Sequence, residues 1–184
     1  NTEVFENLDI KKVVVGCAGC GLTLKTNFGE ILQEEMGRVA QFKVYDINEY
    51  LVNELGSRKM ITPSNELNMR LTYHDPCHLN RGQGIRNEPR ALLRMIPGIE
   101  LVEMKDADRC CGSGGGVRAG RRPLSMAIAR KKAESVRGTM ADTCVTSCPF
   151  CAVQLQDIFQ TLGMETTVSS VVDLLARSYG EVYV

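Results

Sequence analysis

The stretch "MRLTYHDPCHLNRGQGIRNEPRALLRMIPGIELVEM", residues 69–104, combines two strand patterns with a helical pattern between them. Its ends, "MRLTYHD" and "IELVEM", are short and mainly apolar, which is typical of buried strands. Between them, "NEPRALLRMIPG" has apolar residues at helical spacing and ends at Pro97 and Gly98, which terminate helices. A strand, a helix and a second strand predict a parallel strand pair joined by a crossover helix.

The same alternation runs through the rest of the chain. Further strands are predicted at "KKVVVGC", "FKVYDI", "DTCVTS" and "TTVSS". Helices are predicted at "GLTLKTNFGEILQEEM", "NEYLVNELGS", "RRPLSMAIARKKAESVRG", "FCAVQLQDIFQTLG" and "VVDLLARSYG", and a linker at "SRKMITPSNEL". We therefore expect an α/β fold with a mainly parallel sheet flanked by helices. In such sheets, ligands bind beyond the carboxyl ends of the strands.

An internal similarity predicts how the chain is divided. The segment "VVVGCAGCGLTLKTNFGEIL" resembles "CVTSCPFCAVQLQDIFQTL", so that Cys17 and Cys20 match Cys148 and Cys151. Each is followed by a predicted strand and another helix. We expect residues 1–62 to be the C-terminal tail of a first unit and residues 63–184 to be a complete second unit. The two can form one continuous globule, and the chain is then a fragment of a longer protein.

Composition narrows the class of protein. The 184 residues include 22 basic and 22 acidic side chains and no tryptophan, which gives no support for nucleic acid as a partner. No apolar run approaches the roughly 20 residues of a membrane span. The start of the chain lacks the pattern of a signal peptide. We expect a cytoplasmic protein without a direct membrane span, whose membrane association would come through a partner subunit.

The cysteines are the strongest chemical signal. Eight are present, in tight local groups, and such groups in a reducing compartment bind metal or perform redox chemistry more often than they form disulfides. The pair Cys148 and Cys151 alone is ambiguous between zinc, an iron–sulfur cluster and a thioredoxin-like redox pair. The second unit adds Cys77, Cys110 and Cys111. Five sulfurs exceed the four ligands of one zinc ion or of an ordinary cubane cluster.

The glycine-rich segment "CCGSGGG" can be explained by the same need to hold a group larger than one zinc ion. Glycine permits backbone conformations and close approaches that other residues resist. With Gly112, Gly114, Gly115 and Gly116, the loop can bend so that both neighbouring cysteines point inward. Its N–H groups can then bind cluster sulfides. A large, sulfur-rich inorganic group fits this loop best.

Two histidines flank Cys77. His74 and His78 can donate hydrogen bonds to cluster sulfur, or protons to a leaving thiolate, and are therefore weak candidates for catalytic residues. They can equally satisfy backbone carbonyls at the end of a strand. Cys144, inside a predicted strand, is expected to be an inert thiol.

In order, "YHDPCHL", "CCGSGGG" and "CPFC" resemble the cysteine-rich domain named CCG after its Cys-Cys-Gly core. That domain occurs in iron–sulfur subunits of heterodisulfide reductases and of glycolate, lactate and glycerol-3-phosphate oxidoreductases. The segments "HDPCHLNRGQGIRNEPRALLRMIPGIELVEM" and "CCGSGGGVRAG" are most similar to the C-terminal part of the D-type subunit of heterodisulfide reductases.

The resemblance implies a cofactor and its ligands. Cys77, Cys110, Cys111, Cys148 and Cys151 would hold one non-cubane four-iron (4Fe-4S) cluster. Cys17 and Cys20 would be the remaining part of a first motif whose other cysteines are not in this chain, and zinc is an alternative there. The chain by itself is then expected to be inactive.

The resemblance also implies three functional hypotheses. In the first, the chain belongs to an oxidoreductase that reduces a heterodisulfide of the coenzyme M–coenzyme B type or a similar thiol-derived disulfide. In the second, it is an electron-transfer part of a flavin-linked glycolate, lactate or glycerol-3-phosphate dehydrogenase. Partners would be other oxidoreductase subunits: a membrane cytochrome, a flavoprotein or an iron–sulfur subunit. In the third, it is a zinc-binding structural module.

Overall fold

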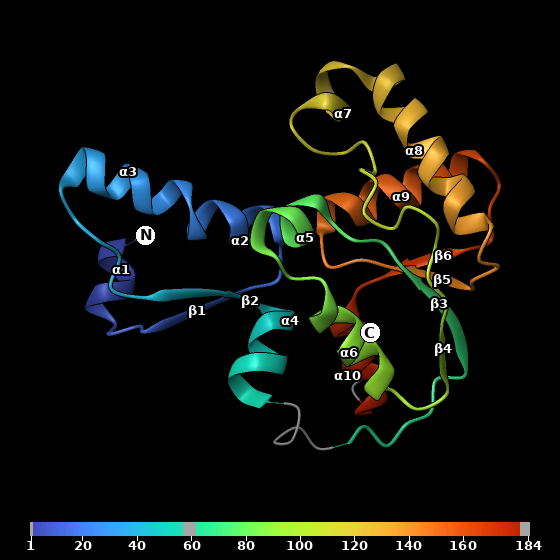
Figure 1. The fold of residues 1–184 in the computed structure, drawn as a ribbon, viewed down its shortest axis with the longest axis horizontal. Coiled ribbons are helices and arrows are strands. Elements are labelled where there is room, and N and C mark those ends of the chain that lie inside the picture. The colour runs from blue at the N-terminus through green and yellow to red at the C-terminus, as the bar shows by residue number, and fades with distance from the viewer. Residues whose placement is uncertain (1, 57–61, 181–184) are drawn as a thin grey trace.

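The computed structural model describes residues 2–56 and 62–180, and its strands form two parallel sheets (Figure 1). The larger sheet has the order β4-β3-β5-β6, from strands β3 (Met69–Tyr73), β4 (Ile99–Leu101), β5 (Thr143–Val145) and β6 (Thr167–Ser169). The smaller sheet pairs β1 (Lys12–Val15) with β2 (Lys43–Asp46). The expected α/β fold with parallel sheets flanked by helices is confirmed.

Helices cover both faces of the larger sheet. On one face, α6 (Asn87–Met95) and α10 (Val171–Ser178) pack against Leu71, Tyr73 and Val145. On the other face, α8 (Arg122–Arg137) and α9 (Pro149–Thr161) pack against Cys144. Neighbouring residues of β5 thus face opposite layers, as strand geometry requires. Cys144 is fully buried in the core, as expected for an inert thiol.

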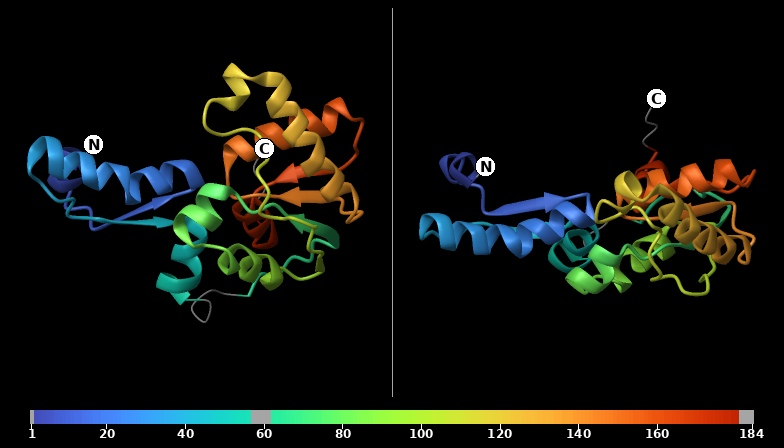
Figure 2. Two further views of the ribbon diagram at one scale, coloured as in Figure 1. Left: turned by 45° about the horizontal axis from the view of Figure 1, so that its top comes forward. Right: turned by 90° about the horizontal axis from the view of Figure 1, so that it is seen from above.

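An arm extends from this three-layer body (Figures 1 and 2). It consists of the smaller sheet with α1 (Thr2–Asn7), α2 (Ala18–Lys25) and α3 (Asn27–Met36). The arm meets the body where α2 contacts α5 (Cys77–Gln83), and the Gln83 side chain donates a 2.9 Å hydrogen bond to the Ala18 carbonyl. Strands β1–β2 and β5–β6 both pair in parallel and in chain order, which is consistent with the repeat. The division of the chain at residues 62 and 63 stays a prediction.

Several local expectations were wrong. The single helix predicted at residues 21–36 is two helices, because Thr26 leaves helical geometry and its hydroxyl binds the Leu22 carbonyl. The helix predicted from residue 48 is α4 (Ile47–Glu49) continued by a π-helical segment, Tyr50–Gly56. Sequence patterns missed the short helices α1, α5 and α7 (Val117–Gly120). Of the predicted linker, residues 57–61 lie outside the described residues, and residues 62–67 form neither helix nor strand.

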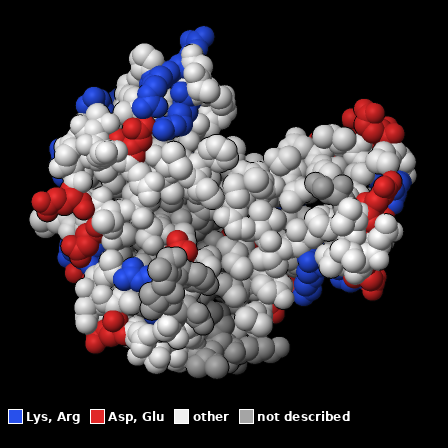
Figure 3. Space-filling view, turned by 180° about the vertical axis from the view of Figure 1, so that it is seen from behind, with Lys and Arg blue, Asp and Glu red and all other residues white. Residues whose placement is uncertain are grey.

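Part of the positive surface on the back of the body has a packing role. Lys and Arg side chains gather over α7 and the start of α8 (Figure 3). Two of them, Arg118 and Arg122, form ion pairs of 2.9 Å and 2.8 Å with Asp157 of α9. These contacts hold the α7–α8 corner against α9, the helix that begins directly after Cys148.

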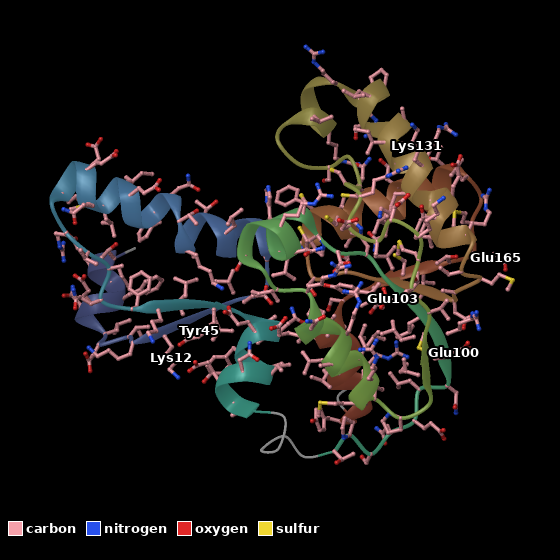
Figure 4. All side chains as sticks on the ribbon, in the orientation of Figure 1. Lys12, Tyr45, Glu100, Glu103, Lys131 and Glu165 are labelled. Atoms are coloured by element: carbon pink, nitrogen blue, oxygen red, sulfur yellow. The ribbon has the colours of Figure 1, made fainter. Side chains whose placement is uncertain are left out.

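A buried arginine connects α6 to the sheet edge that carries Cys77. Arg90 forms a fork of two 2.8 Å bonds with Asp75, which is 1% exposed, and also binds Glu103 at 2.6 Å and 2.9 Å. Its guanidinium also lies 5.0 Å from the centroid of the Tyr73 ring. Figure 4 labels Glu103, which follows β4 in the sequence. A bidentate pair fixes both distance and orientation, so Arg90 positions the segment between β3 and α5.

The Cys-Cys-Gly turn is held close to α8 by Gly112. Its φ is +88°, and a Cβ at this position would lie 2.5 Å from the Ser125 carbonyl oxygen. The Ser125 hydroxyl donates a 2.8 Å hydrogen bond to the Gly112 carbonyl. Only glycine therefore satisfies both the backbone conformation and the close contact with the helix.

We predict that Arg90→Met lowers the free energy of unfolding by about 3–5 kcal/mol, because it leaves the buried Asp75 carboxylate unpaired. Arg94→Met, an exposed change on the same helix, should stay within about 0.5 kcal/mol of the parent. Denaturant unfolding followed by circular dichroism gives both values. Equal effects of the two substitutions would contradict the role assigned to Arg90.

We also predict that Gly112→Ala destabilises the chain by about 2 kcal/mol or more, because alanine resists a positive φ and its Cβ meets a backbone oxygen. Gly114→Ala is the matched control, since no atom beyond its chain neighbours lies within 4 Å of a Cβ there. Thermal or denaturant midpoints compare the two variants. If both midpoints stay at the parent value, the packing requirement at Gly112 is wrong.

Candidate metal centre

One cavity of about 490 Å³ collects every cysteine that the sequence proposed as a ligand. Its lining cysteines are Cys17, Cys20, Cys77, Cys110, Cys111, Cys148 and Cys151. They come from the segments that follow β1, β3, β4 and β5, at the carboxyl ends of the strands. Because β3 and β5 are parallel neighbours, the turns after them lie side by side. The remaining thiol, Cys144, does not line this cavity.

The sulfurs are close together and differ in exposure. The Sγ atoms of Cys111 and Cys151 are 3.3 Å apart, and the Gly112 N–H donates to Cys110 Sγ at 3.3 Å. Cys111, Cys148 and Cys151 are buried, whereas Cys110 is exposed. All eight cysteines are free thiols. The cavity thus has a buried sulfur-rich wall and an accessible rim.

The thiols share protons unequally, because each can donate to or accept from a neighbour. The pKa of Cys110 is lowered by hydrogen bonds from Cys111 and Cys77, and the pKa of Cys77 is raised by the same contact. The pKa of Cys148 is lowered by the Cys151 thiol, with help from backbone N–H groups at the start of α9. Thiolate charge is therefore favoured at two points of the cavity, and thiolates are what metals bind.

His74 lies at the cavity wall without a hydrogen bond from its ring. It is 1% exposed, and neither ring nitrogen has a partner among the described residues. Burial lowers its pKa to about 3, with a smaller contribution from the nearby Lys132 charge. A neutral, buried imidazole keeps one N–H for a partner inside the cavity. His78 also lines the cavity, beside Gly19 of α2.

The four glycines of the loop divide their roles. Gly114 lines the cavity, and Gly112 supplies the N–H that points at Cys110 Sγ. Gly115 and Gly116 are not among the lining residues and take left-handed backbone angles, with φ of +64° and +75°. They turn the chain into α7.

The apolar and hydroxyl-bearing residues of the cavity wall were not predicted from the sequence. Thr23, Leu24, Pro76, Ser113 and Phe150 also line the cavity. Phe150 lies between Cys148 and Cys151 and is 65% exposed, and Leu24 falls one turn after Cys20. Their positions next to the cysteine pairs were the available signal. Ser113 keeps a buried hydroxyl without a partner among the described residues.

The residues present fit an inorganic group with several metal atoms. The donors are predominantly soft sulfur, which iron–sulfur clusters and zinc favour. The unpartnered N–H of His74 and hydroxyl of Ser113 are the hydrogen-bond donors that cluster sulfides require. A single ion also has a partial site here, because ligand atoms of His74, Cys111 and Cys151 lie within 4.8 Å of one another. That site would use two of the seven cysteines that line the cavity.

Three curated relatives are named as subunits of redox enzymes. The chain is 39% identical over 182 residues to the B subunit of fumarate reductase (CoM/CoB) from Methanothermobacter marburgensis, covering 98% of this chain and 35% of the relative. It is 36% identical over 183 residues to the D subunit of dihydromethanophenazine:CoB–CoM heterodisulfide reductase from Methanosarcina barkeri, covering 98% and 44%. It is 35% identical over 187 residues to the probable glycolate oxidase iron–sulfur subunit of Bacillus subtilis, covering 98% and 41%.

The chain therefore spans less than half the length of each of these three relatives. The sequence profile of the cysteine-rich domain family CCG matches residues 71–156. That range contains Cys77, the Cys110–Cys111 pair and the Cys148–Cys151 pair. With this match and the cavity that the cysteines line, residues 71–156 of the chain are identified as a CCG cysteine-rich domain.

Proposed function

We propose that the chain binds an iron–sulfur cluster in this cavity and forms part of an oxidoreductase. The observation that carries the proposal is the lining of one cavity by Cys77, Cys110, Cys111, Cys148 and Cys151, which come from separate segments. A relative named as a probable glycolate oxidase iron–sulfur subunit supports the nature of the cofactor. We assign the five cysteines as its ligands and, because they exceed the four of a cubane, propose a non-cubane four-iron cluster.

The chain's own residues would prepare the site. A bound cluster would supply one-electron storage and transfer. Cys110 and Cys148, whose thiolates are favoured, offer negative sulfur at two separate parts of the cavity. Gly112 holds the Cys-Cys turn against α8 and directs its N–H at sulfur. His74 would donate its N–H toward the group, and Arg90 would keep the Cys77 segment in place through Asp75.

We propose that the substrate of the complete enzyme is a disulfide of the coenzyme M–coenzyme B type. Two of the relatives carry CoM and CoB in their names. The rim of the cavity has exposed Cys110 and Phe150, which leaves room for a small molecule beside the sulfur wall. His78, at the same cavity, is the candidate to give a proton to a leaving thiolate, because an imidazole within reach can act as a general acid.

A relay function is the second candidate. The glycolate oxidase iron–sulfur subunit is nearly as similar to this chain as the heterodisulfide reductase subunit is. In that case the cluster would pass electrons from a flavin-containing partner and the cavity would bind no disulfide. Cys17 and Cys20 line the cavity from the arm, and we propose that they complete a second metal site, with iron or zinc, in a longer protein.

The partners and location follow from the same proposal. Other oxidoreductase subunits would bind this chain and supply its electrons. Among the described residues, every helix is too short or too polar to cross a membrane. A cytoplasmic location, with any membrane attachment through a cytochrome subunit, stays a prediction.

We predict that the chain, purified without oxygen, contains iron and acid-labile sulfide in equal amounts and gives an EPR signal on one-electron oxidation or reduction. Elemental analysis and sulfide assay measure this directly. Zinc without iron or sulfide would overturn the iron–sulfur proposal and favour a structural ion held by His74, Cys111 and Cys151.

We further predict that Cys111→Ala loses most of the iron and the EPR signal, because one ligand disappears from the buried wall. Cys144→Ala is the matched control, since both thiols are buried and only Cys111 lines the cavity. Iron per folded chain is the measurement. Equal iron in both variants would exclude Cys111 as a ligand.

Preparations of the complete complex separate the two redox functions. Within a complete complex, turnover of the heterodisulfide with a reduced dye supports disulfide reduction. Rapid electron exchange with a flavoprotein subunit and no turnover supports the relay.

A further inference from the structure

A buried lysine lies behind the sulfur wall. Lys132 belongs to α8 and is 0% exposed. Its ammonium group donates hydrogen bonds to the carbonyls of Asp106, at 2.6 Å, and Ala107, at 3.1 Å, and lies 3.9 Å from Met104 Sδ. These three residues belong to the segment that leads from β4 to Cys110 and Cys111.

The positive charge of Lys132 is not cancelled by a neighbouring carboxylate. Among the described residues, none forms an ion pair with it. The acidic groups within its electrostatic reach, Asp75 and Asp108, are already paired with Arg90 and Arg81. Burying an ammonium group is unfavourable, and burial lowers the pKa of Lys132. A positive charge kept in this place without an acidic partner is stabilised by any negative group that lies nearby.

The negative group that fits is on the cavity side. Lys132 acts electrostatically on Cys111, on Cys144 and on His74. Cys111 and His74 line the cavity, whereas Lys132 does not. Its charge therefore reaches the cavity through the protein interior, where screening by water and salt is weak. Carbonyl acceptors, unlike a carboxylate, leave the net charge of the ammonium group in place.

We propose that Lys132 is a fixed positive charge that raises the reduction potential of the group bound in the cavity. This inference rests on the proposed iron–sulfur function. Accepting an electron makes a cluster and its thiolates more negative, and a nearby buried cation stabilises that reduced form more than the oxidised form. Lys132 does not line the cavity, so it acts as a tuning residue and not as a catalytic one. Its contacts with Asp106 and Ala107 also hold the loop that precedes Cys110.

The test compares midpoint potentials of four proteins loaded without oxygen. Lys132→Met removes the charge and the hydrogen bonds, whereas Lys132→Gln removes the charge and keeps a donor for the loop carbonyls. Lys131→Met is the matched control, because Lys131 lies on the exposed side of the same helix (Figure 4). Iron and sulfide are measured first, and a dithionite titration followed by EPR then gives each potential.

We expect both Lys132 variants to lower the ratio of reduced to oxidised cluster about tenfold at a fixed potential, which is about 59 mV for a one-electron couple. Lys131→Met should match the parent. If Lys132→Gln keeps the parent potential, the charge assignment is overturned, and a shift in Lys132→Met alone would assign Lys132 to holding the loop. If Lys132→Met fails to retain iron, the midpoint potential of Lys132→Gln alone tests the charge assignment. A parent chain without iron would instead overturn the proposed function itself.

Discussion

Parallel pairing of β3 with β5 is the constraint on which the site depends. The register places Leu71 opposite Thr143 and Tyr73 opposite Val145, so both strands end together. The turn before Cys77 and the turn before Cys148 then open at one edge of the sheet, and a backbone bond from His74 to Val145 continues the alignment beyond the strands. A shift of one residue in this register would turn each inward side chain to the opposite face. Sulfurs from distant parts of the sequence meet because backbone hydrogen bonds fix this edge.

The interior near the cavity contains several buried charged side chains. Asp75, Arg90 and Lys132 are all buried, and each makes hydrogen bonds that form only in the native arrangement. Such groups contribute little net stability compared with an apolar core, but removing one of them is costly. They therefore specify where the cysteine-bearing segments lie. Apolar contacts in the two cores on either side of the sheet provide the driving force for folding.

Much of the architecture could be predicted from sequence. Apolar runs predicted all six strands that the structure describes, and the alternation with helices predicted their parallel pairing. The gathering of the cysteines could be anticipated because they follow strand ends. The break at Thr26 and the π-helical turn after Glu49 could not, because both depend on local bonding that periodicity does not encode. The exposure of Phe150 at the rim and the burial of Lys132 behind the wall could not be predicted either. A sequence pattern assigns aromatic residues to the core and lysines to the surface, and here tertiary packing reverses both.

The cavity is built from two separate parts of the molecule. Cys17 and Cys20 belong to the arm, whereas the other lining cysteines belong to the body, and the arm reaches the body mainly through α2 and α5. Any occupant that binds sulfurs from both parts holds the arm and the body together. By linkage, its binding free energy is added to the docking of the arm, and undocking the arm weakens the hold on the occupant to the same extent. For such an occupant, binding in the cavity and docking of the arm on the body are therefore coupled equilibria.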